Sequence, residues 1–200
     1  MNDKTNKLLS LELKLLNEIS KSKNHSQRSL SKDLNVALGL ANAIIKKFVS
    51  KGILKLQQAP MRRYFYYLTP KGFVEKAKLT KEFLDSSLLF YSRAKDEYEK
   101  LIKINKKKNK KLILLGKSEL TEIATLAASI NNIKIDFIFC PHEKQDYFCG
   151  VKVLNKIDKK KSYYLNSVFI LTDFFEPTNF IKKFESEPEI AIPKFLNIDS

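Results

Sequence analysis

The 200-residue chain carries a formal net charge of +15, and 44% of its residues are hydrophobic. This length and apolar content suffice for one good core or two small ones, which argues against a disordered protein. Two cysteines, no amino-terminal signal segment and no apolar run near 20 residues argue against secreted and membrane proteins, so we expect a cytoplasmic protein with no membrane partner.

Three helices are predicted before residue 52. Over 7–21, apolar residues recur at helical spacing and form one stripe: Leu8, Leu11, Leu15, Leu16 and Ile19. Ser26 is the expected N-cap of a helix over 27–34. A turn at 35–37 precedes a helix over 38–51 that Gly52 ends. This helix is expected to bury Leu40, Ile44 and Phe48 and to expose Asn42, Lys46 and Lys47.

A basic hairpin is predicted next, over 53–69, with its tip at 57–63 and its tyrosines mostly in the core. Two helices around a tight turn, followed by such a hairpin, are the layout of a winged helix-turn-helix, whose second helix enters the DNA major groove. The expected DNA contacts are Ser26, Gln27, Arg28, Leu38, Gly39, Asn42, Lys46, Lys47, Arg62 and Arg63.

These residue types suit different parts of a duplex. The Asn42 amide can form two parallel bonds to adenine, and Gly39 allows close approach of a backbone to another surface. Lys46 and Lys47 suit phosphates. Three of the four arginines lie in the module, and arginine forks onto phosphate or guanine. The alternative for Asn42 and for each charged side chain is a solvated surface position.

A long helix is predicted over 71–104, with Thr69 as its N-cap and Pro70 at its first position. Its apolar or small residues alternate threes and fours, as in a coiled-coil seam: Phe73, Ala77, Thr80, Leu84, Leu88, Tyr91, Tyr98 and Ile102. Pairing with a second copy would make a homodimer with recognition helices about 34 Å apart. Alternatively, the seam packs on the carboxy-terminal half.

The positive charge is confined to the first part of the chain. Through Lys111 there are 26 Lys and Arg against 10 Asp and Glu, and from Leu112 onward 11 against 12. Neutralising phosphates releases counterions, so this distribution favours a nucleic-acid partner. The alternative is a codon bias that enriches Lys, Asn and Ile together. The lysine-rich run 105–111 is the expected linker before a second domain.

The second half alternates strand and helix patterns, which predicts a small parallel sheet. Strands are expected over 112–115, 133–139, 151–154 and 168–171, with helices over 119–130 and near 180–185. Candidate ligand-binding residues lie after two of the strands: Gly116, Lys117, Ser118, Glu119 and Asp173. With one glycine in the turn, a tight turn without a ligand is the alternative.

Metal and catalytic chemistry find little support in the sequence. Cys140, His142 and Cys149 offer three potential ligands, where structural zinc sites usually have four. His25 and His142 are isolated, and no paired carboxylates or Ser-His-Asp set occurs, so neither a cofactor nor an enzyme is expected.

The segments LNVALGLANAIIKKFVSKGILK and YFYYLTPKGFVEKAKLTKEFL resemble MarR-type winged-helix regulators, closest to the subgroup associated with exopolysaccharide gene clusters, over about residues 8–102. The resemblance implies a transcriptional regulator that binds DNA as a dimer. Ala37 departs from the serine that often caps the recognition helix in such proteins. The carboxy-terminal half more faintly resembles the Rossmann-like domain of sugar acyltransferases, which implies a degenerate sensor domain for a phosphate- or sugar-containing effector.

The expected fold is therefore an α+β winged helix-turn-helix domain (1–70), a long linker or dimerisation helix (71–104), a basic linker (105–111) and a small α/β, Rossmann-like domain with a parallel sheet (112–200). The expected function is sequence-specific binding of double-stranded DNA. Two alternatives are a nucleotide-sugar or phosphate-ligand enzyme and a nonspecific architectural nucleic-acid binder.

Overall fold

The computed structural model describes residues 3–21, 25–59, 63–141, 143–157, 164, 166–174 and 189–196. The chain divides into two compact units, Met1–Leu88 and Leu89–Ser200. The division falls inside one long helix, α4 (Pro70–Lys107), rather than at the predicted linker 105–111. Each unit is described by itself below.

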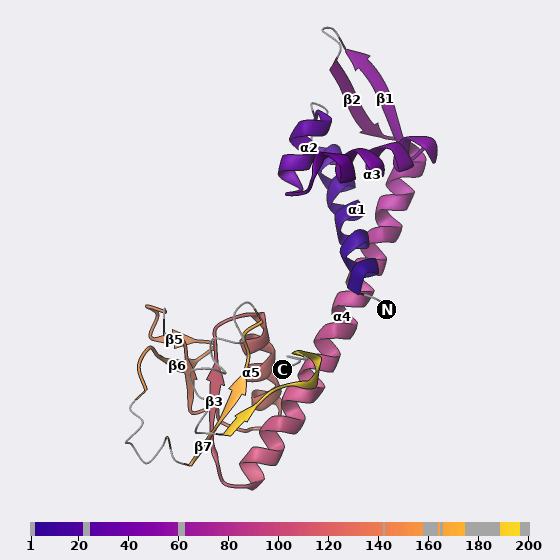
Figure 1. Ribbon diagram of the computed structural model, residues 1–200. Coiled ribbons are helices and arrows are strands. Elements are labelled where there is room, and N and C mark those ends of the chain that lie inside the picture. Colours follow the sequence, from indigo (N-terminus) through magenta and orange to yellow (C-terminus); the bar gives the residue numbers. More distant parts are fainter. Residues whose placement is uncertain are drawn as a thin grey trace. The chain divides into compact units, whose positions relative to one another are not determined.

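The first unit contains three helices, a two-stranded hairpin and the first part of a fourth helix (Figure 1). Its elements are α1 (Asp3–Lys21), α2 (Gln27–Asp33), α3 (Leu38–Ser50), β1 (Leu54–Ala59), β2 (Arg63–Leu68) and the first part of α4. The strands pair antiparallel, from Leu54 opposite Leu68 to Ala59 opposite Arg63. These elements confirm the helix-turn-helix and wing that the sequence predicts.

The core of the first unit lies between α1, α2, α3 and the base of the hairpin. It contains Leu15, Leu16, Ile19, Leu30, Ile44, Ile45, Phe48, Ile53, Leu54 and Tyr66. Two expected burials are wrong: Leu8 is 44% exposed near the free end of α1, and Leu40 is 43% exposed. At 100° per residue, Leu40 lies beside the buried row of α3 rather than in it, and Ala41 and Ile45 take its place.

The start of α4 is held tightly against the turn that follows α3. The Thr69 hydroxyl accepts a hydrogen bond from the Gly72 amide at 3.0 Å and donates to the Gly52 carbonyl at 2.7 Å. A Cβ on Gly72 would lie 2.2 Å from the Ile53 carbonyl oxygen and 2.9 Å from Leu68 Cδ2. The glycine is therefore required by the close approach of two backbones.

The second unit is built on a six-stranded sheet of order β5-β6-β4-β3-β7-β8. Its strands are β3 (Lys111–Leu115), β4 (Phe137–Phe139), β5 (Tyr147–Phe148), β6 (Val151–Leu154), β7 (Ser167–Leu171) and β8 (Glu189–Ala191). Neighbours pair parallel except β5, which pairs antiparallel with β6. The sheet is thus mixed, which corrects the expectation of a purely parallel one: a two-residue turn, Cys149-Gly150, joins β5 directly to β6.

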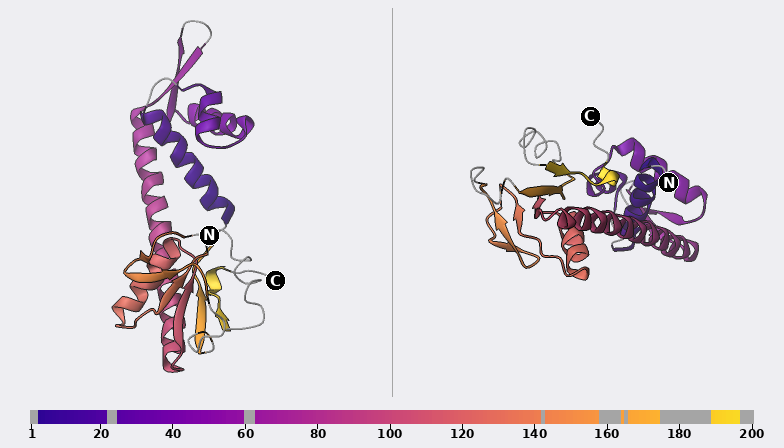
Figure 2. Two further views of the ribbon diagram at one scale, coloured as in Figure 1. Left: turned by 90° about the vertical axis from the view of Figure 1, so that its left-hand side faces the viewer. Right: turned by 90° about the horizontal axis from the view of Figure 1, so that it is seen from below.

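Helix α5 (Glu119–Ile130) and the last turns of α4 cover one face of this sheet (Figures 1 and 2). Leu112 and Leu114 of β3 contact them, whereas Ile113 and Leu115 point to the other face, as the period of two in a strand requires. The predicted strand over 133–139 is confined to Phe137–Phe139. The predicted helix near 180–185 lies outside the described residues. Beyond the predicted elements, the strand β8 and a short 3-10 helix (Lys194–Leu196) form.

The seam of α4 has two different environments. Phe73, Leu84 and Leu88 are 60%, 52% and 65% exposed. Farther along, Tyr98 and Ile102 are fully buried in the core of the second unit, where the Tyr98 hydroxyl donates to the Leu171 carbonyl oxygen at 3.0 Å and burial raises the pKa of Tyr98. The last part of the seam therefore packs within the chain, and the part before Ala94 remains exposed except at the half-buried Thr80.

Candidate nucleic-acid interface

Helix α3 has one buried and one exposed side. Ala41, Ile44, Ile45 and Phe48 form the buried side. The residues opposite them, which we call the outer face of α3, are all exposed: Gly39, Ala43, Lys46 and Ser50. This face joins two small residues near the start of the helix to a cation and a hydroxyl near its end, so it can approach another surface closely at one end and an anion at the other.

Gly39 has no structural reason inside the protein to be glycine. A Cβ built on it meets nothing within 4 Å, and its φ is outside the left-handed region. Glycine in a helix costs about 0.5–1 kcal/mol relative to alanine. The neighbouring N-cap, Ala37, provides no side-chain hydrogen bond, as the sequence indicates. The flanking Leu38 and Leu40 are each 43% exposed, so the first turn of α3 presents mostly apolar atoms to solvent.

Asn42 lies at the edge of the outer face rather than at its centre. Its residue is half-buried, and its Oδ1 atom is buried with no hydrogen-bond partner among the described residues. An unsatisfied buried acceptor costs about 1–3 kcal/mol. The amide is therefore held in an unfavourable position, from which it gains by turning toward an external donor.

The two lysines of α3 differ in their surroundings. Lys46 is exposed, and no ion pair of its ammonium occurs among the described residues. Lys47 pairs with Glu12 of α1, a carboxylate in a residue that is only 8% exposed. Lys47 thus fastens α3 to α1, which the sequence prediction missed. The signal was present: Glu12 stands four residues from both Leu8 and Leu16, on the apolar stripe of α1.

The start of α2 presents the other predicted contacts of this module. Ser26 caps the helix by accepting from the Ser29 amide at 3.0 Å, and Arg28 is exposed. Gln27 is half-buried and donates through Nε2 to the Tyr66 hydroxyl at 2.9 Å, which ties α2 to the wing. Burial raises the pKa of Tyr66, so this hydroxyl stays protonated.

The wing carries exposed apolar side chains beyond its buried base. Tyr66 is 3% exposed, whereas Tyr64 is 46% and Leu56 42% exposed, so the expectation that the wing tyrosines are mostly core is wrong for Tyr64. Of the two predicted tip arginines, Arg62 lies outside the described residues. Arg63 begins β2, and its side chain also lies outside them.

In the second unit, the predicted ligand residues meet at the carboxyl ends of β3 and β7. Gly116 has φ +99°, and a Cβ there would lie 2.5 Å from Asp173 Cβ. Ser118 is buried, caps α5 and donates to the Thr172 carbonyl oxygen at 2.5 Å. The structure thus brings both segments together, and the Gly116 turn packs directly against Asp173.

The charges at this turn are already paired. Lys117 Nζ lies 2.5 Å from Glu143 Oε2 and 2.7 Å from Gln145 Oε1. Hydrogen bonds from Lys117 and from two backbone amides lower the pKa of Glu143 to about 2. Glu119 and Glu122 occupy the first turn of α5, where they complement the helix dipole and oppose an added anion. The arrangement therefore does not favour a phosphate.

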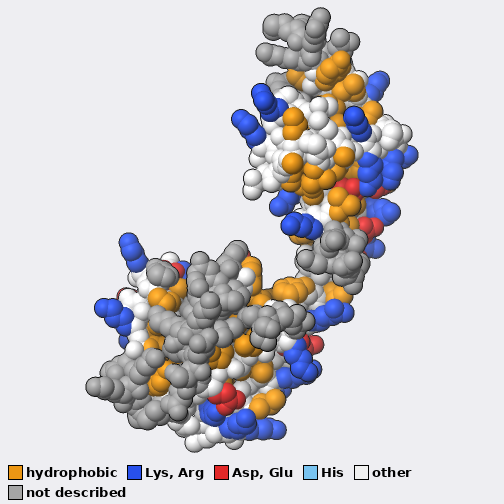
Figure 3. All heavy atoms as spheres, viewed as in Figure 1, with side chains coloured by type: hydrophobic (Ala, Val, Ile, Leu, Met, Phe, Trp, Pro, Cys, Tyr) orange, Lys and Arg blue, Asp and Glu red, His pale blue; other side chains and the backbone are white. Residues whose placement is uncertain are grey.

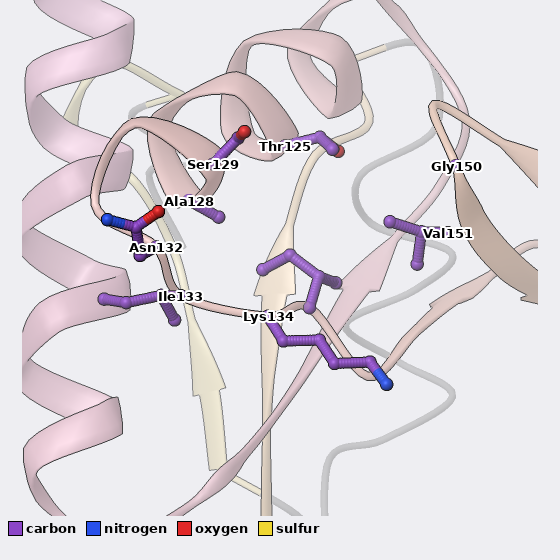
Figure 4. Close-up of a pocket in the computed structure, with 9 residues that line it drawn as sticks. Thr125, Ala128, Ser129, Asn132, Ile133, Lys134, Gly150 and Val151 are labelled. Carbon is purple, nitrogen blue, oxygen red and sulfur yellow. The ribbon is translucent and has the colours of Figure 1, made fainter.

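A shallow cavity of about 390 Å³ lies elsewhere in this unit, between the end of α5 and the β5–β6 turn (Figure 4). Thr125, Ser129 and Asn132 lie on its α5 side, and Gly150 and Val151 on the other. None of the predicted ligand residues lines it.

No cluster of three metal-binding side chains occurs among the described residues, and His142 lies outside them. Cys140 is half-buried and Cys149 is exposed. In the described part of the chain, no helix combines the length and apolarity needed to span a bilayer.

Residues 8–55 match the family of winged helix-turn-helix DNA-binding domains. The chain therefore contains a DNA-binding domain of this class. The match covers α1, α2, α3 and the start of β1, which are the elements that build and support the outer face of α3. A comparison with curated proteins gives no match.

Among solved structures, the chain is similar to FabT of Streptococcus pneumoniae in complex with DNA, with 24% identity over 60% of this chain and 69% of FabT and a TM-score of 0.33. It is also similar to the adhesin competence repressor AdcR of Streptococcus pyogenes (17% identity, 61% and 78% covered, TM-score 0.36). A MarR transcriptional regulator of Methanosarcina mazei gives 22% identity, 62% and 76% coverage and a TM-score of 0.35. The DNA-binding domain is identified by the match over residues 8–55.

Proposed function

We propose that the protein is a transcriptional regulator that reads duplex DNA with α3 in the major groove and the β1–β2 hairpin on the adjacent backbone or minor groove. The observation that carries the proposal is the outer face of α3, which is exposed and begins with a glycine that the fold itself does not need. An exposed glycine lowers the stability of the helix, and such a position is expected where another surface must approach the backbone closely.

In this proposal, Asn42 reads a base. Turning outward would exchange the unsatisfied buried acceptor for two hydrogen bonds to adenine, and a good bidentate pair discriminates by about 1–3 kcal/mol. Leu38 and Gly39 would contact the groove at the start of the helix, where the exposed Leu38 suits a thymine methyl group.

Phosphate contacts are assigned to the exposed cations around this helix. Arg28 and Lys46 are exposed and suit the two sides of the groove, with Ser26 beside Arg28. Lys47 contributes less than the sequence suggests because its ammonium is committed to Glu12. Arg62 and Arg63 remain the proposed wing contacts, and Gln27 sets the wing's attachment to α2.

Selection of bound sequences from random duplex DNA at about 150 mM salt tests the proposal, because weak electrostatic binding is suppressed there. The wild-type protein should enrich one motif. Asn42→Ala should lose selectivity at one position by a factor of about 5–150, the equivalent of 1–3 kcal/mol. Asn17→Ala is the matched control, since it makes the same substitution at a half-buried asparagine of α1, outside the outer face of α3. Absence of any enriched motif would instead favour a nonspecific architectural binder.

We further infer a MarR-type homodimer formed through α4. The support is the resemblance in sequence together with the exposed seam before Ala94, where Leu84 and Leu88 are more than half exposed. Leu84→Glu/Leu88→Glu should give the mass of a monomer in sedimentation, whereas Arg93→Glu, at an exposed position on the opposite side of α4, should retain the dimer. A dimer that survives the double change excludes this interface.

For the second unit we propose the role of an effector sensor or interaction platform, and the proposal assigns no catalytic step to the chain. The strand order resembles a Rossmann-like sheet, in which ligands collect at the carboxyl ends of the strands. Gly116, Lys117, Ser118, Glu119 and Asp173 lie there, although the pairing of Lys117 with Glu143 makes a phosphate-containing effector the less favoured kind.

A further inference from the structure

Five exposed lysines gather where α4 ends and β3 begins. We call them the lysine surface: Lys100, Lys106, Lys107, Lys108 and Lys111. None of the five has an ion-pair partner among the residues that the structure describes, whereas Lys103 and Lys110 of the same stretch pair with Glu99 and Glu189. Figure 3 shows Lys and Arg side chains gathered at the end of the second unit where Figure 1 places the turn between α4 and β3.

The helix dipole accounts for only part of this cluster. Lys106 and Lys107 lie in the last turn of α4, where a cation is favourable by about 0.3–1 kcal/mol. Lys108 directly follows this turn, and its amide still donates to the Ile104 carbonyl oxygen, so it shares this gain. Lys100 lies almost two turns earlier and Lys111 begins β3, so these two gain little from the dipole. Like charges along one stretch repel each other, and the nearby carboxylates of Glu99 and Glu189 are already paired with Lys103 and Lys110. The Asp136 carboxylate accepts a hydrogen bond from the Leu112 amide. The cluster therefore suits a partner that carries many negative charges.

The position of the lysine surface separates it from the candidate ligand site of the same unit. Lys111 begins β3, so the surface lies at the amino ends of the parallel strands β3 and β7. Gly116 and Asp173 follow the carboxyl ends of these strands. Small ligands of such sheets bind at the carboxyl ends, so a partner of the lysine surface contacts an exposed edge and not a pocket.

We propose that the lysine surface binds the phosphate backbone of duplex DNA, as a second and sequence-independent contact outside the winged helix-turn-helix. The inference rests on the proposed function only in taking duplex DNA as the partner. DNA is favoured over other polyanions because the same chain contains a DNA-binding domain, to which α4 links the lysine surface covalently. The contact raises affinity and salt dependence without changing the preferred sequence.

The slope of log Kd against log salt concentration counts phosphate contacts, at about 0.9 for each cation on duplex DNA. We compare the full-length protein with Lys106→Gln/Lys107→Gln/Lys108→Gln. The control is Lys144→Gln/Lys152→Gln/Lys156→Gln, which removes the same charge from exposed residues of the same unit on and beside β5 and β6. The first triple variant should have a slope that is smaller by about 2.7, and the control should keep the wild-type slope within about 0.9.

Equal slopes for the two triple variants would overturn the inference, and so would a loss seen with RNA hairpins but not with duplex DNA. A motif enriched by the wild-type protein, together with equal slopes, leaves the proposed function standing and removes only the lysine contact. A smaller slope for the first triple variant, without any motif enriched by the wild-type protein, supports the lysine contact and contradicts sequence-specific recognition through α3. A wild-type protein that does not bind duplex DNA at all refutes both.

Discussion

Gly39 allows the stability of α3 to be separated from its contact with DNA. Gly39→Ala adds one methyl group at a position where a Cβ meets nothing within 4 Å and where φ is not left-handed. Alanine should therefore stabilise the helix by about 0.5–1 kcal/mol. For a folding unit of 60–100 residues this raises the melting temperature by about 2–8 °C.

The same methyl group should weaken binding. If the first turn of α3 lies against the groove, the Cβ takes space that DNA atoms occupy, and we expect at least a tenfold rise in Kd, equivalent to about 1.4 kcal/mol. Thermal melting followed by circular dichroism measures the first effect, and fluorescence anisotropy with the selected duplex measures the second. Opposite signs in the two assays are the expected signature of a residue kept for contact and not for folding.

Gly52→Ala is the matched control, because a Cβ there also meets nothing within 4 Å but φ is +68°. A left-handed conformation costs a non-glycine residue about 1–2 kcal/mol, so this variant should be less stable while its folded fraction binds DNA normally. The reasoning about Gly39 is refuted if Gly39→Ala binds the selected duplex as tightly as the wild-type protein does.

Three further outcomes are expected. Gly72→Ala should destabilise the first unit by more than 2 kcal/mol in urea unfolding, since its Cβ would lie 2.2 Å from the Ile53 carbonyl oxygen. Ala37→Ser should supply the absent cap of α3 and stabilise it by about 1 kcal/mol in the same assay. The pKa of Glu143, about 2, should rise toward 4.5 in Lys117→Met, as measured by NMR titration. Because the pKa of Glu143 is lowered in the folded state, the ion pair stabilises the fold above about pH 4.5, and this stabilisation is lost as the pH falls toward 2.

The elements of the first unit follow from local patterns in the sequence. The caps Ser26 and Thr69, the stop at Gly52 and the apolar spacing of α3 each depend on residues within a few positions, and these elements form where the sequence predicts them. The expectation that Leu40 is buried is wrong because residues spaced four apart do not lie on one line along a helix of 3.6 residues per turn. Local sequence patterns thus predict where the helix begins and ends, whereas the side of the helix that is buried depends on its packing against the core.

The contacts that the sequence could not supply are those between residues far apart in the chain. The pairing of Lys47 with Glu12 and that of Lys117 with Glu143 each join different elements, and each changes how many charges are available to a partner. The mixed sheet was missed for a similar reason, because β5 has two residues and shows no periodicity. Charge counts from sequence therefore overstate the cations that face DNA.

The start of α3 breaks two local rules at once. Ala37 gives no cap, and Gly39 weakens the first turn, which together cost about 1.5–2 kcal/mol of helix stability. The burial of Ile44, Ile45 and Phe48 outweighs this cost, since each such side chain contributes about 1.5–3 kcal/mol when fully buried. The helix α3 is therefore stabilised by its buried side and not by its first turn. The first turn of α3 is weak and can adjust its position against the floor of a DNA groove. The packing of the rest of the helix against the core keeps the position of Asn42 fixed.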